Sequence, residues 1–260
     1  MDKANIQTIR KWTYLKKYLH AYTTIVSNHF SQFFYIDICA GRGRYEGHDG
    51  SPLIALNLEF PFTDYVFNEK DSIKLKELEQ YVKKLPLRKA LTKRRYKQQT
   101  RDINISFKNM NAIDYIKNEL NTLPDSPCFI FIDPDGIEEI DMDSVSICSM
   151  KNKAELFINF SVSGILRNVK NKRCHPLLTR YYGNEDWKKI PNVVNREQLY
   201  ADLYIKSLRN HFRNIANIKL KNDNNIPLYY LIYTTNNDSG FKIMKDVLKQ
   251  SDEQSKLNTL

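Results

Sequence analysis

The segment from Phe33 to Gly47, FFYIDICAGRGRYEG, constrains the fold more than any other part of the sequence. Residues suited to a buried strand lead through Asp37 into a loop with three glycines. Glycine lets the backbone adopt positive φ and pass close to a ligand. In an open α/β sheet, ligands bind at the carboxyl ends of central strands. The segment therefore predicts a first strand at 33–39 that ends in a binding loop.

Four further apolar segments have the length of buried strands, and helical patterns lie between them. The strands are expected at 64–68, 104–108, 128–132 and 155–160, and the helices at 8–30, 51–59, 72–84 and 112–120. Ser51 and Pro52 are expected as the N-cap and the first residue of their helix. Strands that are apolar on both faces and alternate with helices predict an α/β fold. We expect a mostly parallel central sheet with helices on both of its faces.

The C-terminal part predicts a strand of opposite direction. Two strands are expected at 217–220 and 226–234, joined by a short Asn/Asp-rich turn, so the last should be antiparallel to its neighbour. A helix is expected at 241–249. We expect one domain over residues 1–250, with a basic insertion near 83–101, a helical insertion near 167–213, and a polar tail at 251–260.

Composition indicates a cytoplasmic protein without a metal site. The four cysteines are far apart and form no C-x-x-C pair, which fits reduced thiols and offers no metal-ligand spacing. No apolar run approaches the ~20 residues of a membrane helix. The N-terminus has no apolar signal core.

The chain is basic, with 40 Lys and Arg against 30 Asp and Glu. The segment 83–101, KKLPLRKALTKRRYKQQTR, contains no acidic residue. Like charges this dense repel one another unless an anion or an acidic surface faces them. A nucleic acid or an acidic partner protein is therefore expected here, and a solvated surface is the alternative. The candidate contact residues are Arg88, Lys89, Lys93, Arg94 and Arg95.

The glycine loop does not fit two common phosphate-binding motifs. No Gly-Lys-Ser/Thr closes it as in a P-loop, and the third glycine of the dinucleotide fingerprint would fall at Glu46. The spacing D-x-x-x-G-x-G instead resembles the first motif of class I S-adenosylmethionine-dependent methyltransferases. The resemblance implies that Asp37 helps to hold the amino group of this cofactor, and that Gly41 and Gly43 admit its amino acid part. A tight turn without a ligand is the alternative.

Three later strand ends resemble the same class. The resemblance implies that Glu69 holds the ribose hydroxyls and that Asn111 and Ala112 face the adenine, although Asn111 would look the same as a helix N-cap. Asp133 and Asp135, in DPDG, follow the fourth strand, where this class has substrate-facing residues. We predict both as catalytic, with a helix cap or an amine-binding pair as alternatives. Four such sites in chain order are less expected by chance than any one of them.

Longer segments resemble a narrower family, the three-Cys-motif partner proteins. They are SPLIAL, FIFIDPDG, LFINFSVSGILRN, RYYGNEDW and PLYYLIYTTNNDSGFKIM. The resemblance as a whole runs from about Trp12 to Met244. The resemblance implies a Rossmann-like class I methyltransferase fold. It also implies association with a separate protein that carries three cysteines.

Three functions follow as hypotheses. The first is an S-adenosylmethionine-dependent methyltransferase that acts on a nucleic acid or another anionic substrate, together with a three-cysteine partner. The second is a methyltransferase-like subunit without catalysis, because DPDG lacks the aromatic residue of the Asp/Asn-Pro-Pro-aromatic motif of N6-adenine methyltransferases. The third is an NAD-dependent oxidoreductase, which the misplaced glycine and the terminal hairpin disfavour.

Overall fold

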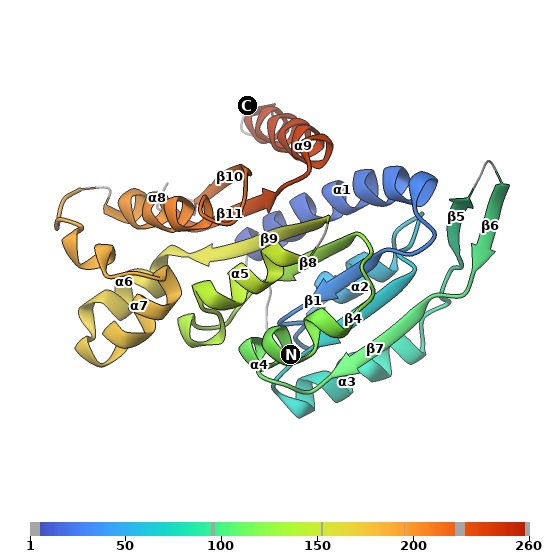
Figure 1. Ribbon diagram of the computed structural model, residues 1–260, viewed down its shortest axis with the longest axis horizontal. Coiled ribbons are helices and arrows are strands. Elements are labelled where there is room, and N and C mark those ends of the chain that lie inside the picture. Colours follow the sequence, from blue (N-terminus) through green and yellow to red (C-terminus); the bar gives the residue numbers. More distant parts are fainter. Residues whose placement is uncertain (1–5, 95–96, 152, 195, 222–226, 258–260) are drawn as a thin grey trace.

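The centre of the molecule is a seven-stranded sheet with the order β10-β11-β9-β8-β1-β4-β7 (Figure 1). The computed structural model describes residues 6–94, 97–151, 153–194, 196–221 and 227–257. The strands of the sheet are β1 (Phe34–Asp37), β4 (Asp64–Asn68), β7 (Asn104–Lys108), β8 (Cys128–Ile132), β9 (Ala154–Ser161), β10 (Asn214–Lys221) and β11 (Pro227–Thr235).

Strand direction confirms the predicted fold class. β7, β4, β1, β8 and β9 are mutually parallel along the sheet. β11, the last strand in the chain, is antiparallel to both of its neighbours, β9 and β10, so β10 runs parallel to the other five. The fold is therefore α/β and Rossmann-like, with the antiparallel last strand expected of a class I methyltransferase.

Helices cover both faces of the sheet because alternate residues of the buried strands point to opposite sides. One face is covered by α1 (Ile6–His29), α2 (Ser51–Leu56), α3 (Ser72–Lys83) and α9 (Asp238–Leu257). The other is covered by α4 (Ala112–Asn118), α5 (Met142–Met150), α6 (Val162–Lys170), α7 (His175–Tyr182) and α8 (Arg196–Leu208). In β8, for example, Ile130 and Ile132 pack on the second face, while Phe129 and Phe131 pack on the first.

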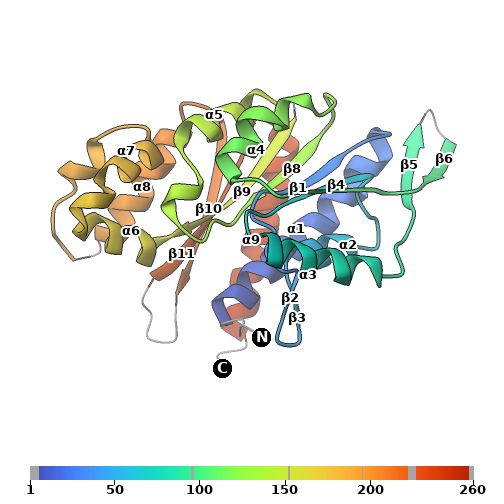
Figure 2. The ribbon, with the colours of Figure 1, turned by 90° about the horizontal axis from the view of Figure 1, so that it is seen from below.

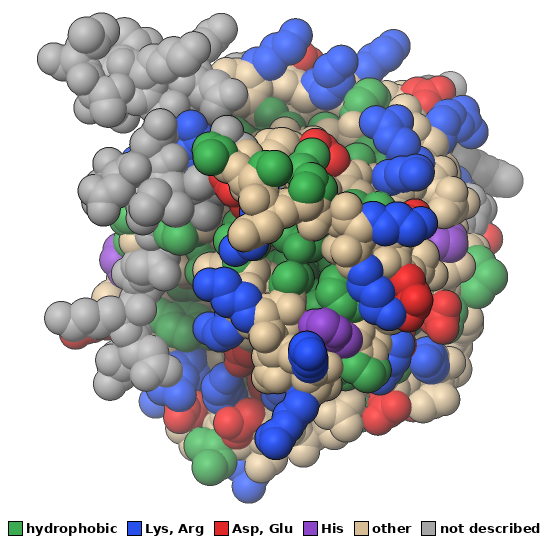
Figure 3. All heavy atoms as spheres, turned by 90° about the vertical axis from the view of Figure 1, so that its left-hand side faces the viewer, with side chains coloured by type: hydrophobic (Ala, Val, Ile, Leu, Met, Phe, Trp, Pro, Cys, Tyr) green, Lys and Arg blue, Asp and Glu red, His purple; other side chains and the backbone are tan. Residues whose placement is uncertain are grey.

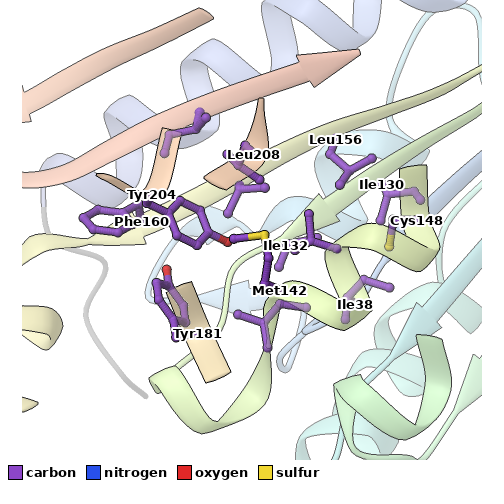
Figure 4. Close-up of a cluster of buried hydrophobic side chains, with 14 of the residues drawn as sticks. Ile38, Ile130, Ile132, Met142, Cys148, Leu156, Phe160, Tyr181, Tyr204 and Leu208 are labelled. Atoms are coloured by element: carbon purple, nitrogen blue, oxygen red, sulfur yellow. The ribbon is translucent and has the colours of Figure 1, made fainter. Parts of the chain in front are cut away.

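The second face has a core of aliphatic residues at the sheet and aromatic residues beyond it. Figure 4 shows Ile130, Ile132 and Leu156 of the central strands above Met142 of α5, with Phe160, Tyr181 and Tyr204 on the side of the helical block. The Tyr181 and Tyr204 rings are stacked with centroids 4.8 Å apart. This contact joins α7 to α8 and fixes the helical block against the end of β9.

The two predicted insertions lie at opposite ends of the sheet (Figures 1 and 2). The basic segment forms an antiparallel hairpin of β5 (Ala90–Arg94) and β6 (Lys97–Arg101), which the sequence analysis did not anticipate as strands. The segment that follows β9 contains α6, α7 and α8, and short 3-10 helices at Lys172–Cys174 and Asp186–Lys189 lie between them. Figure 3 shows Lys and Arg side chains distributed over this end of the molecule with acidic side chains between them.

Three local predictions were wrong. Gly50, and not Ser51, is the N-cap of α2, so Ser51 is the first helical residue. Helix α5 after DPDG was missed, because its apolar and polar residues follow no clear helical spacing in MDSVSICSM. Finally, α9 extends from Asp238 to Leu257, beyond the end expected at residue 249.

Candidate active site

Four predicted site segments meet at one edge of the sheet because they follow strands that are neighbours in the order β7-β4-β1-β8. The carboxyl ends of parallel strands lie on the same side, so the residues that follow them are brought together. A cleft at this edge is lined by Ile38, Cys39, Gly41, Tyr45, Asn68, Glu69, Lys70, Lys74, Met110, Ala112, Asp133, Asp135 and Glu139. All four segments contribute to this lining, as the sequence pattern predicted.

The glycine loop adopts a conformation that requires glycine. Gly41 and Gly43 have φ of +63° and +81°, a region that other residues enter at a cost. A Cβ at Gly41 would lie 2.3 Å from the Tyr45 hydroxyl, and one at Gly43 would lie 2.5 Å from Leu78. Gly41 therefore lets Tyr45 lie over the loop, whereas Gly43 lets the loop pack on α3. Gly43 is not among the residues that line the cleft.

Glu69 fixes the loop after β1 to the end of β4. Its Oε2 accepts a hydrogen bond from the Gly41 backbone N–H at 2.8 Å. Its Oε1 accepts one from the Asp71 N–H at 2.9 Å. A carboxylate has about four lone-pair sites, so each oxygen keeps a site that can accept from a ligand hydroxyl. Glu69 is buried and lines the cleft, which gives this carboxylate a fixed orientation there.

Asp37 lies beneath the cleft and not in its lining. Its side chain is 0% exposed, and its Oδ2 accepts a hydrogen bond from the Tyr35 hydroxyl at 3.1 Å. Burial raises the pKa of Asp37 to about 7, although a hydrogen bond from Ser51 acts in the opposite direction. Among the described residues its Oδ1 is buried without a hydrogen-bond partner. The predicted contact of Asp37 with a ligand amino group would use this oxygen.

Of the two predicted residues after β7, Ala112 lines the cleft and Asn111 does not. Ala112 is buried in the lining beside Met110 and Ile38, so this part of the cleft is apolar. Asn111 is exposed and is the N-cap of α4, but its side chain makes no capping hydrogen bond. Its amide lies 3.4 Å from Asp114. The site therefore contains the predicted small residue, and Asn111 stays at its rim.

Asp133 is held by two residues that the sequence analysis missed. The ammonium group of Lys11, in α1, donates to Asp133 Oδ2. The amide of Asn159, in β9, donates to Asp133 Oδ1 at 2.7 Å. Lys11 is only 7% exposed. Lys11 precedes Leu15 by four residues and Tyr18 by seven, so it lies on the apolar face of α1. A lysine at such a position is the sequence signal that could have identified it.

Asn159 also had a sequence signal. It interrupts the apolar run ELFINF near the carboxyl end of a strand that is buried on both faces. A polar side chain in such a strand needs a partner, and strand ends are where partners of functional interest lie. This segment was interpreted as a strand and as part of a family resemblance, and no role was predicted for Asn159.

Charged residues cross the cleft in pairs and narrow it. Lys70 pairs with Glu139, and Lys74 lies 3.2 Å from the exposed carboxylate of Asp135. The hydrogen bond from Lys70 to Glu139 raises the pKa of Lys70. As a result, the cleft has about 60 Å³ of space that water can enter. A ligand the size of a nucleoside requires these side chains to move, and both lysines are long and partly exposed.

A second, smaller recess lies on the other side of the DPDG loop. It is lined by Pro134, Asp135, Gly136, Ile137, Asn159, Ser161, Gly164, Arg167, Asn168 and Tyr181. Asp135 lines both the recess and the cleft, and Asn159, which holds Asp133, lines the recess. Arg167 is the basic residue in this lining, so an anionic group that entered here would meet a guanidinium.

The predicted contact residues of the basic segment are only partly within the described structure. Arg88 and Lys89 are exposed just before the hairpin, and Lys89 lies 3.1 Å from Asp102. Lys93 and Arg94 belong to β5, but their side chains, like all of Arg95, lie outside the described residues. The role of this segment stays a prediction.

Two kinds of structure are absent from the described residues. No helix there is both long and apolar enough to span a bilayer. No group of three or more His, Cys, Asp or Glu side chains is arranged to hold a metal ion.

Comparison with known proteins supports the fold. No family model and no curated protein sequence matches the chain. Protein LPL1258 from Legionella pneumophila, described with the family model DUF519, is similar over 94% of this chain and 91% of its own, with 15% identity and a TM-score of 0.57.

Two ligand-bound structures are more distant. The O-methyltransferase from Bacillus cereus in complex with SAH covers 85% of this chain and 80% of its own, at 10% identity and a TM-score of 0.48. Trm1 from Pyrococcus horikoshii with S-adenosyl-L-methionine covers 94% and 58%, at 13% identity and a TM-score of 0.39. Likeness at such identities concerns the fold alone, and the similarity to protein LPL1258 supports the α/β fold described above.

Proposed function

We propose that this protein is an S-adenosylmethionine-dependent methyltransferase that acts on a nucleic acid or another anionic substrate. One observation carries the proposal: the Gly41 loop, Glu69, Ala112 and Asp133 line one cleft at the carboxyl edge of four adjacent parallel strands. In a fold of this class, that edge is the ligand site.

The side chains at this edge fit the parts of the cofactor. Glu69 keeps acceptor sites for two adjacent ribose hydroxyls. Ile38, Met110 and Ala112 offer an apolar surface for the adenine. Asp37 holds a buried oxygen with no partner among the described residues, and it suits the cofactor's ammonium group. When bound, S-adenosylmethionine supplies an electrophilic methyl group on its sulfonium.

Asp133 would orient the acceptor and take its proton. Its two oxygens are fixed by Lys11 and Asn159, and such positioning contributes to catalysis by holding the base in one geometry. The adjoining recess would admit the acceptor beside Asp135, with Arg167 near an anionic group. The basic segment that starts at Lys83 supports a polyanionic acceptor.

Calorimetric titration with S-adenosylmethionine, its demethylated product S-adenosylhomocysteine, and NAD tests the proposal directly. We expect 1:1 binding of the first two, and none of NAD. Radiolabelled methyl transfer to total RNA, DNA and protein fractions then identifies the acceptor class. Binding of NAD without the methyl donor would contradict the proposal.

A second candidate is a methyltransferase-like subunit that binds the cofactor or a partner without catalysis. The Lys11–Asp133 ion pair favours it, because the Lys11 ammonium occupies an Asp133 oxygen that a methyl acceptor would otherwise use. Cofactor binding without methyl transfer to any acceptor fraction would support this candidate over the first.

We also propose that the protein works with a separate three-cysteine-motif protein, on the resemblance of its SPLIAL, FIFIDPDG and RYYGNEDW segments alone. Co-expression with a three-cysteine protein from the same genome, followed by size-exclusion chromatography, tests this. A stable complex that increases methyl transfer would support it, and separate elution of the two chains would contradict it.

A further inference from the structure

A second cavity lies far from the candidate active site, at the amino edge of the sheet. It is lined by Tyr22, Val26, Phe30, Pro127, Lys153, Glu155, Asn236 and Asn237. Pro127 and Glu155 lie at the starts of β8 and β9, opposite the strand ends that form the active-site cleft. α1 and α9 flank this side of the sheet (Figure 1).

The size of this cavity suits a small molecule. Its volume is about 430 Å³, within the roughly 300–1,000 Å³ of ordinary ligand pockets. It is larger than the active-site cleft, whose water-accessible space is about 60 Å³. Val26, Phe30 and Pro127 make much of its wall apolar. A molecule that filled it would therefore be mainly hydrophobic.

Glu155 places a buried carboxylate in this wall. It is 2% exposed. Its Oε2 accepts hydrogen bonds from the hydroxyls of Tyr18 and of Tyr233, the latter at 2.7 Å. Among the described residues, the one hydrogen bond to its Oε1 comes from the Asn237 amide, at 3.5 Å. No ion pair to Glu155 occurs among the residues that the structure describes, and a buried carboxylate is costly without a cation.

Tyr22 adds a buried hydroxyl that has no hydrogen-bond partner among the described residues. The residue is 4% exposed, and its hydroxyl makes no hydrogen bond to any described residue. The ring is fixed by stacking on Phe62, with centroids 5.6 Å apart. Buried hydroxyls in native proteins are normally hydrogen-bonded, so a preformed, unpaired hydroxyl beside a carboxylate points to a ligand with a donor group.

We propose that this cavity binds a compact apolar molecule with one primary amine, whose ammonium group pairs with Glu155 Oε1 and donates to the Tyr22 hydroxyl. The apolar body would lie against Val26, Phe30 and Pro127. Lys153 is the competing cation: its ammonium lies over the Phe30 ring, 5.2 Å from the centroid. Glu155 can therefore accept one positive charge on the ligand. Lys153 would repel a second charge, so an extended polyamine is disfavoured.

Ligand-observed NMR with benzylamine, benzyl alcohol and benzoate, which differ in head-group charge, tests the proposal. At about pH 8 we expect benzylamine to bind with a Kd on the order of 1 mM. It should bind at least about tenfold more tightly than benzyl alcohol, because the amine alone forms an ion pair with the buried carboxylate of Glu155. Benzoate should not bind, because it would place a second carboxylate beside Glu155.

Two kinds of variant localise the binding. Glu155→Gln keeps an acceptor for Tyr18 and Tyr233 and should remove the preference for the amine. Val26→Trp fills the cavity from α1 and should abolish binding of both ligands; it decides the test if Glu155→Gln does not fold. Glu69→Gln, in the active-site cleft, is the matched control and should leave benzylamine affinity unchanged.

Two results would overturn the proposal: equal affinity for benzylamine and benzyl alcohol, or benzylamine binding that survives Val26→Trp. Loss of benzylamine binding in Glu69→Gln would assign the amine to the active-site cleft instead. The proposal is independent of the methyltransferase function.

Discussion

The ammonium group of Lys11 donates to the carboxylate of Asp133, although 122 positions separate the two residues in the chain. The contact ties the first helix to the loop after β8 across the candidate active site. Lys11 side-chain exposure is 9% and that of Asp133 is 20%, so solvent screens this pair only in part. Several testable consequences begin with this pair and with its neighbours in the cleft.

Replacing Lys11 should destabilise the fold through Asp133. Lys11→Met leaves the carboxylate desolvated with only Asn159 as a partner, and we expect the free energy of unfolding to fall by about 1–3 kcal/mol. Asp133→Asn removes the orphaned charge, so the double variant should recover part of the loss. Urea unfolding of the four proteins in this double-mutant cycle measures the coupling. Additive effects would mean that the pair is not formed in solution.

Glu69→Gln should weaken binding of S-adenosylmethionine by roughly 10- to 100-fold, or about 1.4–2.8 kcal/mol. The glutamine amide would oppose one of the two backbone N–H groups that Glu69 now accepts, at Gly41 and Asp71, so both the loop and the ribose acceptor are disturbed. Calorimetry measures the change, and Glu59→Gln, on the exposed surface, is the control. Unchanged affinity in Glu69→Gln would remove the ribose assignment.

Gly41 and Gly47 allow steric and backbone effects to be separated. Both have positive φ, so alanine at either should cost about 1 kcal/mol from backbone strain. A Cβ at Gly47 meets nothing within 4 Å, but at Gly41 it lies 2.3 Å from the Tyr45 hydroxyl. Gly41→Ala should therefore be the more destabilising in urea, and adding Tyr45→Phe should reduce the excess. Equal losses at both sites would contradict the position of Tyr45.

Asp37 should make stability fall as pH rises towards neutrality. Burial raises its pKa in the folded protein to about 7, whereas an unfolded chain ionises near 3.9. Between about pH 4 and about pH 7 the unfolded state releases a proton that the folded state keeps, so the free energy of unfolding decreases with pH and levels off above that window.

The variant Asp37→Asn isolates this contribution. It should gain stability relative to the wild type between about pH 5 and about pH 8 in urea titrations. The same trend from Glu155, whose pKa burial also raises to about 7, is present in both proteins and cancels in the comparison. A stability difference that does not change with pH would contradict a protonated, buried Asp37.

Charge reversal before the basic hairpin tests for a polyanion. Arg88→Glu with Lys89→Glu should weaken binding of a single-stranded oligonucleotide and lower the slope of log K against log salt by about 1–2. Fluorescence anisotropy across a salt series measures both. Reversing Lys188 and Lys189, which pair with Glu185 and Asp186 in the helical block, is the control. If the variant and the wild type had identical salt slopes, the segment before the hairpin would be a solvated surface that does not bind a polyanion.

The fold was largely predictable because the sequences of buried parallel strands are short apolar runs. The segments 64–68 and 128–132 were predicted with the bounds that the structure has, and so was the edge strand 104–108, which is only partly buried. The hairpin of β5 and β6 was not, because a dense run of like charges gives no alternation of apolar and polar residues. Its strands pair with each other outside the main sheet, a choice that local sequence does not express.

The sequence by itself determined which residues follow the strand ends, and hence that Gly41, Glu69, Ala112 and Asp133 would gather at one edge. Glycine loops and acids at such ends are local features, and parallel topology brings them together. Only the tertiary structure decided that Lys11 neutralises Asp133, that Asp37 is buried beneath the cleft, and that Glu155 lies in a cavity wall without an ion pair to any described residue. The first and the last depend on how α1 packs across the sheet, because Lys11, Tyr18 and Tyr22 belong to this helix. The charge balance of a buried group is set by neighbours in space and not by neighbours in sequence.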